Sequence, residues 1–344
     1  MPGEVWTVAD DEAVIFDGTT VAVRHGLAPD TDYRDGDVTW RTLPRPGGEL
    51  LATVTAVNDL HFGETECGLL IDMNLGPVLS SAPGAPPYPT MMNTAAVAEM
   101  ELLDPAAVIV KGDVTTVGLA AEYDAFEACY RPTFGDRLHI TRGNHDNRAT
   151  FAAFTAPLHE AVVVPGAVLA LVDTSRPGEG GGSLDAGQLA WLDDVAASAD
   201  RPVLVFGHHP CFEAGADDWM GAASHLATED SEALIALVAR RPAIVGYFSG
   251  HTHRNRVRRF AATGDVPFAE VGSVKDFPGS WAEYRIFEGG ILAVHRRLSD
   301  PAALEWSESC RALFAGLYPR YAGGDPGDRS YPVWPRSPRA REAT

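Results

Sequence analysis

Runs of consecutive apolar residues alternate along most of the chain with stretches whose apolar residues have helical periodicity. This alternation predicts strands separated by helices. Six runs are apolar at consecutive positions, as in strands that are buried on both faces of a sheet. They lie at 50–57, 106–113, 137–146, 167–173, 202–210 and 243–253, several of them running into loops. Stretches with helical periodicity lie between them, at 93–103, 119–131, 185–197 (with Asp185 as its expected cap) and 230–241. This alternation predicts an α/β fold.

The two ends of the chain differ from this core. Residues 1–47 carry short β-like runs, and the part at 26–44 resembles the closing strands of a fibronectin-type-III-like sandwich. The segment is too short for the roughly 100 residues of a complete sandwich. We therefore expect a small, partly fibronectin-like β appendage at 1–47, a main domain at 48–300, and a C-terminal helix and tail at 301–344. The stretch 303–321 could form an amphipathic helix that either packs on its own domain or joins copies of a homo-oligomer.

Between residue 253 and the C-terminal helix the pattern changes from α/β alternation to successive β runs. These runs lie at 256–260, 267–273, 282–288 and 290–298. Their spacing is typical of antiparallel strands that complete a sheet.

Composition narrows the class of partner. Apolar residues make up 45% and charged residues 22% of the 344 residues, as in a globular protein with a sizeable core. The formal net charge of −20 argues against a nucleic-acid polymer or an anionic membrane surface, but it leaves a small phosphorylated substrate open. The sequence has no signal-peptide pattern and no uncharged apolar run long enough to span a bilayer. The four cysteines have no paired spacing, so we expect reduced thiols and a cytoplasmic location.

Candidate metal ligands follow five of the predicted strands. Because ligands collect at the carboxyl ends of strands in an open α/β sheet, we expect these side chains to meet at one edge. Chance can supply one such motif, or a pair of surface histidines in a turn, but rarely all five in this order. The motifs are NDLH (Asp59, His61), KGD (Asp113), GNHD (Asn144, His145, Asp146), GHHP (His208, His209) and GHTH (His251, His253).

These motifs, spread over about residues 51–298, resemble those of the calcineurin-like metallophosphoesterase superfamily, most closely its bacterial class III cyclic-nucleotide phosphodiesterase-like branch. The resemblance implies a four-layer αββα sandwich and a centre of two metal ions, with Asp113 bridging them. One ion would be held by Asp59, His61, Asp113 and His253, and the other by Asp113, Asn144, His208 and His251. Mixed oxygen and imidazole ligands suit Mn, Fe, Zn or Co, as divalent or mixed-valence ions, better than Ca.

The same resemblance gives His145 a role beside the metals. It would protonate the leaving group, or stabilise charge on the phosphoryl oxygens, during in-line attack by a metal-bridging hydroxide. Asp146 is expected to orient the imidazole of His145, with a loop-capping role as the alternative. Purple acid phosphatases, which also begin with a fibronectin-like domain, carry a tyrosine ligand where this chain has Thr116, so no iron–tyrosinate is expected.

Substrate contacts are less well defined by the sequence. His209, Arg254 and Asn255 adjoin expected ligands, and each could touch substrate or brace its loop. The leading hypothesis is a phosphodiesterase for a small phosphodiester, such as a cyclic nucleotide or a glycerophosphodiester. A phosphomonoesterase is the alternative, although only Arg142 and Arg254 offer extra positive charge for a dianion. A non-catalytic binding scaffold is a third hypothesis, which the complete set of seven ligand residues disfavours.

Overall fold

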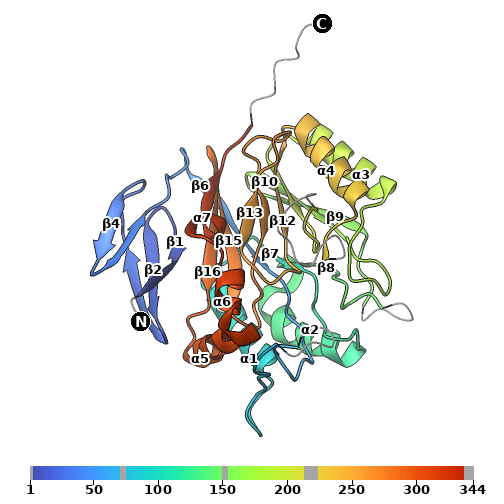
Figure 1. Cartoon of the computed structure of the whole chain (residues 1–344). Helices are drawn as coiled ribbons and strands as arrows, with labels where there is room; N and C mark the ends of the chain where they lie inside the picture. Colours follow the sequence, from blue (N-terminus) through green and yellow to red (C-terminus); the bar gives the residue numbers. More distant parts are fainter. Residues whose placement is uncertain (1–2, 70–74, 149–153, 213–223, 337–344) are drawn as a thin grey trace, which may run out of the picture.

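The computed structural model describes residues 3–69, 75–148, 154–212 and 224–336, and two six-stranded sheets form its centre (Figure 1). In the first sheet the spatial order is β17 (Tyr331–Val333), β16 (Gly290–Arg297), β15 (Ser280–Phe287), β6 (Leu50–Val57), β7 (Ala107–Lys111) and β8 (Leu138–Thr141). In the second it is β13 (Arg256–Arg258), β14 (Phe268–Glu270), β12 (Ile244–Ser249), β11 (Val203–Phe206), β10 (Ala167–Val172) and β9 (His159–Val164).

Three apolar clusters hold four layers together. One cluster lies between the sheets and includes Ile109 of β7 and Phe206 of β11. A second packs β6, β7 and β8 against α1 (Tyr88–Glu101) and α2 (Ala120–Phe134), and a third packs β10, β11 and β12 against α3 (Ala186–Ser198) and α4 (Thr228–Arg240). The strands of this core are apolar on both faces because each face is covered. The predicted αββα sandwich is therefore confirmed.

Strand direction explains why the site gathers at one edge. β6, β7 and β8 pair in parallel, as do β10, β11, β12 and β14. Their carboxyl ends therefore lie together, where the ligand motifs follow. β15, β17, β9 and β13 run the other way and β16 runs in the same direction as β6; these five strands extend the sheets on their outer sides.

Element boundaries depart from the sequence prediction in a few places. α1 begins at Tyr88, five residues before the predicted start, with Pro89 in the first turn where a missing N–H costs nothing. The strand predicted at 167–173 is confirmed as β10, and β9, which was not predicted, pairs with it antiparallel across a turn at Gly166, a residue with φ of 82°. Asp185 caps α3 as predicted, since its carboxylate accepts the backbone N–H of Gln188 at 2.8 Å. No helix in the described ranges is long and apolar enough to cross a membrane.

The N-terminal appendage is a small β unit beside the first sheet (blue in Figure 1). It comprises a three-stranded sheet of β1 (Glu4–Val8), β2 (Glu12–Asp17) and β3 (Thr20–His25), and a hairpin of β4 (Asp32–Asp35) and β5 (Val38–Arg41). Arg285 of β15 ties the appendage to the sandwich, because its guanidinium binds Asp10 at 2.8 Å and Asp11 at 2.7 Å.

The C-terminal segment is more ordered than a helix and tail. The predicted helix at 303–321 is broken into α5 (Pro301–Ser309), two 3₁₀ turns and α6 (Tyr318–Gly323), because Phe314 and Ala315 have left-handed backbones. The segment packs on its own domain, where Leu313 and Tyr318 join an apolar cluster with Trp6 of the appendage. After α7 (Pro326–Arg329), β17 pairs with β16 in the first sheet. The rest of the predicted tail, 337–344, lies outside the described residues.

Candidate metal centre

The seven predicted ligands lie at one edge of the sandwich and come from both sheets. Asp59, His61, Asp113 and Asn144 follow β6, β7 and β8 of the first sheet, and His208, His251 and His253 follow β11 and β12 of the second. In each of several groups of three carboxylate and imidazole residues, the nearest donor atoms lie within 4.8 Å of one another. Asn144 joins them, because its Oδ1 lies 3.3 Å from His208 Nε2.

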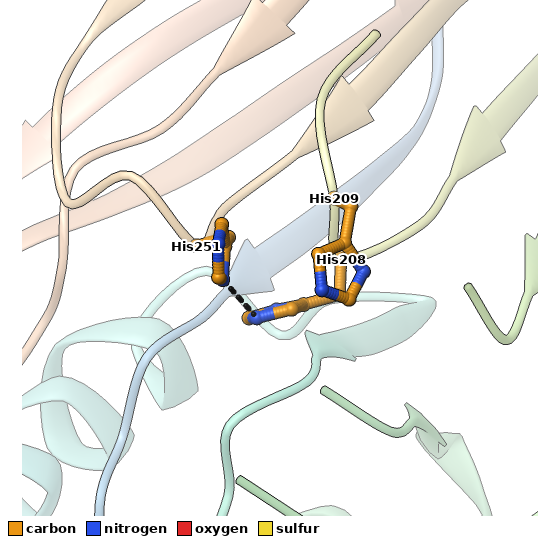
Figure 2. Close-up of side chains that lie close together, drawn as sticks. All are labelled: His208, His209 and His251. Carbon is orange, nitrogen blue, oxygen red and sulfur yellow. Dashed lines mark hydrogen bonds between the residues drawn. The ribbon is translucent and has the colours of Figure 1, made fainter. Parts of the chain in front are cut away.

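One group of candidate ligands, called the second ligand set, consists of Asn144, His208 and His251. The donor atoms of Asn144 and His251 both lie close to Nε2 of His208. His251 Nδ1 lies 3.2 Å from His208 Nε2, the contact drawn in Figure 2. Asp113 Oδ2 lies 3.3 Å from the same nitrogen. Amide oxygen, two imidazoles and a carboxylate thus surround one point, which is a donor set for a transition metal.

The other group, the first ligand set, consists of Asp59, His61 and His253. His253 Nε2 lies 3.6 Å from Asp59 Oδ1, and His61 Nε2 lies 3.7 Å from Asp113 Oδ2. His61 is 5% exposed, and its Nε2 is buried without a hydrogen-bond partner. A buried polar atom without a partner is costly, and a metal ion at this place would remove the cost. The residues of the site therefore fit a metal.

Asp113 belongs to both sets. Its Oδ2 faces His61 of the first set and His208 of the second, while its Oδ1 accepts the backbone N–H of His145 at 2.9 Å. One carboxylate between two groups of donors is the arrangement that a pair of neighbouring metal ions requires.

The backbone at the ligands is strained. Nine residues other than glycine have positive φ in the described part of the chain, and five of these are ligand candidates: Asp59, His61, Asp113, His251 and His253, with φ between 50° and 68°. Each such conformation costs about 1–2 kcal/mol for a residue with a Cβ. Strain of this kind persists where the surrounding structure over-determines a residue, and it is concentrated at functional sites.

Gly112 makes close approach to a ligand possible. Its φ is +82°, and a Cβ built on it would lie 2.7 Å from His208 Nδ1 and 2.6 Å from the backbone nitrogen of Gly143. The KGD motif therefore needs glycine for two reasons: the left-handed backbone and the space that His208 occupies.

Hydrogen bonds on the far side of the rings orient the histidines. His208 Nδ1 donates to the carbonyl of Lys111 at 2.7 Å, and His253 Nδ1 lies 3.3 Å from the carboxylate of Asp276. These contacts place the proton on Nδ1 and leave Nε2 of each ring facing the other ligands. Such partners fix the tautomer and orientation of metal-binding histidines.

The pKa values of the site residues depend on two effects, burial of each group and its contacts with charged neighbours. Burial, together with neighbouring positive groups, lowers the pKa of His61 and His251 well below the usual range. Burial also opposes charge on His208, but the Asp113 carboxylate outweighs it and raises the pKa to about 9. Burial would raise the pKa of Asp113, yet His208 and His145 hold it well below its usual range. The carboxylate is therefore ionised, as a ligand must be.

His145 lies beside the first ligand set. Its ring centroid is 4.6 Å from that of His61, and its Nδ1 donates to the carbonyl of Thr116 at 2.6 Å. Arg148, which the sequence did not single out, donates to the same carbonyl at 2.8 Å. Thr116 thus orients His145 through its backbone, which no side-chain pattern could predict.

Asp146 does not orient His145, so that prediction was wrong. Its buried carboxylate accepts the backbone N–H groups of Val114, Thr115 and Gly143 at 3.1, 2.8 and 2.9 Å, and the Thr115 hydroxyl at 2.7 Å. Burial and the charge of Asp113 raise the pKa of this carboxyl to about 6. Asp146 therefore has the alternative role: it joins the loop that carries Asp113 to the loop that carries Asn144 and His145.

His209 was a candidate substrate contact, and the structure places it as a loop brace. The side chain is fully buried. Its Nδ1 lies 2.8 Å from the Thr174 hydroxyl, and its Nε2 lies 3.1 Å from the Gly180 carbonyl. A carbonyl can only accept, so Nε2 carries the proton and Nδ1 accepts from the hydroxyl. Both ring nitrogens are thereby used within the protein.

Arg254 and Asn255 also point into the protein. Arg254 is 7% exposed and donates to Glu270 at 2.8 Å. Asn255 is 3% exposed, and its side chain bonds to the backbone of Ala322 and Gly272 at 3.1 Å each. Neither is placed to contact substrate, because each is held by partners that fix the loop after His253.

Lys111 is a buried group that the sequence reading missed. Its ammonium is fully buried and donates to the Ser249 carbonyl at 2.6 Å, which joins β7 to β12 beneath the site. Burial lowers the pKa of Lys111 to about 7. The signal was present, since a lysine inside an otherwise apolar central strand is rarely buried without a partner.

Fold and site together define a metal-binding α/β sandwich of the phosphoesterase type. The sequence profile of the calcineurin-like phosphoesterase family matches residues 52–255, which is more than half of the 344 residues. The chain belongs to the calcineurin-like phosphoesterase family, and this confirms the resemblance inferred from the motifs.

Curated relatives of the chain are bacterial phosphodiesterases. A glycerophosphodiester phosphodiesterase of Enterobacter lignolyticus is 31% identical over 164 residues, which cover 43% of this chain and 56% of the relative. A cAMP/cGMP dual specificity phosphodiesterase of Mycobacterium tuberculosis is 29% identical over 162 residues, which cover 44% of this chain and 49% of the relative. The chain spans about half the length of the curated relatives it matches.

A solved structure supports the fold. A dimetal phosphatase from Danio rerio superposes with a TM-score of 0.57 over 72% of this chain and 97% of that chain, at 14% sequence identity. The likeness at this identity concerns the arrangement of sheets and helices, and it agrees with the αββα architecture.

Proposed function

We propose that this chain is a metal-dependent phosphoric ester hydrolase that cleaves a small phosphodiester of the cyclic-nucleotide or glycerophosphodiester type. The observation that carries the proposal is the pair of ligand sets that share Asp113, with His145 beside them. Similarity to two diester-cleaving bacterial enzymes supports the choice of substrate class.

The donors of the two sets define the cofactor. When bound, two ions of Mn, Fe, Zn or Co would neutralise charge on the phosphoryl oxygens and lower the pKa of a water molecule, so that hydroxide is available to attack phosphorus. Asp59, His61 and His253 would hold one ion, and Asn144 and His208 with His251 the other. Asp113 would contribute to both. The positive charge of the ions would draw a phosphate into a protein whose net charge is −20.

His145 is placed to handle the proton of the leaving group. Its Nδ1 is occupied by the Thr116 carbonyl at 2.6 Å, so Nε2 is the nitrogen free for substrate. A proton on Nε2 would pass to the alcohol oxygen as the bond from phosphorus to that oxygen breaks. Hydrolysis leaves a free alcohol and a phosphate monoester, as two molecules from a glycerophosphodiester and as two groups of one molecule from a cyclic nucleotide.

The two arginines that the sequence offered for binding a monoester dianion are already paired within the protein. A monoester dianion calls for additional cationic groups, and the sequence offered Arg142 and Arg254 for this purpose. Arg142 binds the buried carboxylate of Asp173 at 2.7 Å, and Arg254 binds that of Glu270 at 2.8 Å. Both guanidinium groups are thus already paired within the protein, which weakens the phosphomonoesterase alternative.

The test is a comparison of bis(p-nitrophenyl) phosphate with p-nitrophenyl phosphate, using metal-free protein reloaded with Mn²⁺. We expect faster hydrolysis of the diester, followed by a screen of cyclic nucleotides and glycerophosphodiesters. Faster hydrolysis of the monoester would contradict the proposal and favour a phosphatase. Two bound ions without turnover of either ester or of any compound in the screen would favour a binding scaffold.

A further inference from the structure

The C-terminal segment 301–323, which lies beyond the residues that match the family profile, is attached to the loops of the first ligand set. The Tyr321 hydroxyl donates to the carbonyl of Thr252, the residue between the two histidines of the GHTH motif, at 2.9 Å. The indole N–H of Trp306 donates to the Lys275 carbonyl at 2.9 Å. The segment therefore supports backbone next to a ligand and next to the residue that orients it.

Tyr318 of this segment is linked to His253, a candidate ligand, through the carboxylate of Asp276. The Tyr318 hydroxyl donates to Oδ1 of Asp276 at 2.8 Å, and Oδ2 of Asp276 lies 3.3 Å from Nδ1 of His253. Tyr318 is 4% exposed and Asp276 is 2% exposed. Both oxygens of the carboxylate are thus directed, one by the tyrosine and the other toward a ligand of the first set.

A buried ion pair extends the same support to His61. Lys275 Nζ lies 2.5 Å from Glu64 Oε2 and 3.6 Å from Asp276 Oδ2, and Glu64 Oε2 lies 4.0 Å from His61 Nδ1. The two histidines of the first set are therefore connected, on the side away from the ligand atoms, by one chain of charged groups, of which Lys275 and Asp276 are buried.

Two ligands of the second set have a different support. His208 is oriented by the Lys111 carbonyl of the central strand β7, and Asn144 lies in the loop that follows β8. These two supports belong to the sandwich core and not to the C-terminal segment.

We propose that Tyr318 is a positioning residue for the first ligand set alone: through Asp276 it orients His253 and thereby sets the affinity of one of the two metal positions. This rests on the proposed function in assigning His253 as a ligand. Removing a partner that orients a ligand lowers metal affinity by about 10–100-fold.

The experiment is a Mn²⁺ titration of metal-free protein by calorimetry, with bound metal counted by elemental analysis. The variant is Tyr318→Phe, which removes the hydroxyl and keeps the ring. The control is Tyr123→Phe, which removes a hydroxyl that donates to the carboxylate of Glu127 at 2.7 Å on helix α2. Both substitutions are repeated in Asn144→Ala, which retains the first set, and in Asp59→Asn, which retains the second.

We expect Tyr318→Phe to weaken the single remaining position of Asn144→Ala by about 10–100-fold and to leave that of Asp59→Asn unchanged. Tyr123→Phe should leave both unchanged. Equal weakening of both positions, or no weakening, would overturn the role of Tyr318 while leaving the metal centre in place. Failure of the wild-type chain to bind two ions would instead overturn the proposed function, and this proposal with it.

Discussion

Substitution of Gly112 by alanine tests whether the strand ends are shaped around the ligands. The new Cβ would lie 2.7 Å from His208 Nδ1 and 2.6 Å from the Gly143 nitrogen, and at these distances both neighbours must move away. Gly84 is the matched control, because its φ of +83° equals that of Gly112 within a degree and nothing lies within 4 Å of the Cβ position.

The two substitutions share the conformational cost and differ in the steric cost. A left-handed backbone at alanine costs about 1–2 kcal/mol in either variant. Overpacking adds about 1–3 kcal/mol at Gly112 only. The movement of His208 also disturbs its hydrogen bond to the Lys111 carbonyl, so metal affinity should fall by about 10–100-fold.

The assays are urea unfolding of the metal-free proteins and Mn²⁺ titration of the folded ones. We expect Gly112→Ala to unfold at a lower urea concentration than Gly84→Ala, with the same dependence of the free energy of unfolding on urea. Only Gly112→Ala should bind metal more weakly than wild type. Equal unfolding midpoints and equal affinities in the two variants would refute the argument that Gly112 makes room for His208.

Further predictions concern proton transfer by His145, the junction of two loops at Asp146, the N-cap of α3 and the bound metals. His145→Gln should retain both metals by elemental analysis while losing about 100-fold or more of diester hydrolysis, since proton transfer typically contributes at least that factor; loss of metal would show a structural role instead. Asp146→Ala leaves four donors without a carboxylate and should lower the free energy of unfolding by more than about 2 kcal/mol, measured with urea. Asp185→Ala, which removes only the cap on α3, should cost about 1 kcal/mol in the same assay and leave metal binding intact. Chelation of the metals should lower the melting temperature, and addition of Mn²⁺ should restore it; an unchanged melting curve would argue against binding at a folded site.

Much of the architecture could be predicted because a strand that is buried on both faces consists almost entirely of apolar residues. A run such as Ala107–Lys111 is apolar at nearly every position, and the motif that follows it needs no tertiary information to be recognised. The same holds for the seven ligand candidates, which the fold brings together as the order of strands implied.

The errors arose where a residue's partner is distant in sequence or is a backbone atom. His145 is oriented by the carbonyl of Thr116, which is invisible in a pattern of side chains, so Asp146 was given the role. Arg254 adjoins a ligand in sequence, but its partner Glu270 comes from β14, the second strand after it. Both lysines of the chain, Lys111 and Lys275, are buried, and the groups that bind them, the Ser249 carbonyl and Glu64, are distant from them in sequence.

The division of the ligands between two sheets sets the order of events during synthesis. Asp59 and His251, whose carboxylate and backbone N–H meet at 3.0 Å, are 192 residues apart in the chain. At about 5–20 residues per second, the ribosome needs roughly 10–40 s to make the second after the first. Until then a nascent chain lacks His251 and His253, and without them neither ligand set is complete. Metal ions held by these ligands would therefore reach their final arrangement only after the loop that follows β12 has been made and the two sheets have joined.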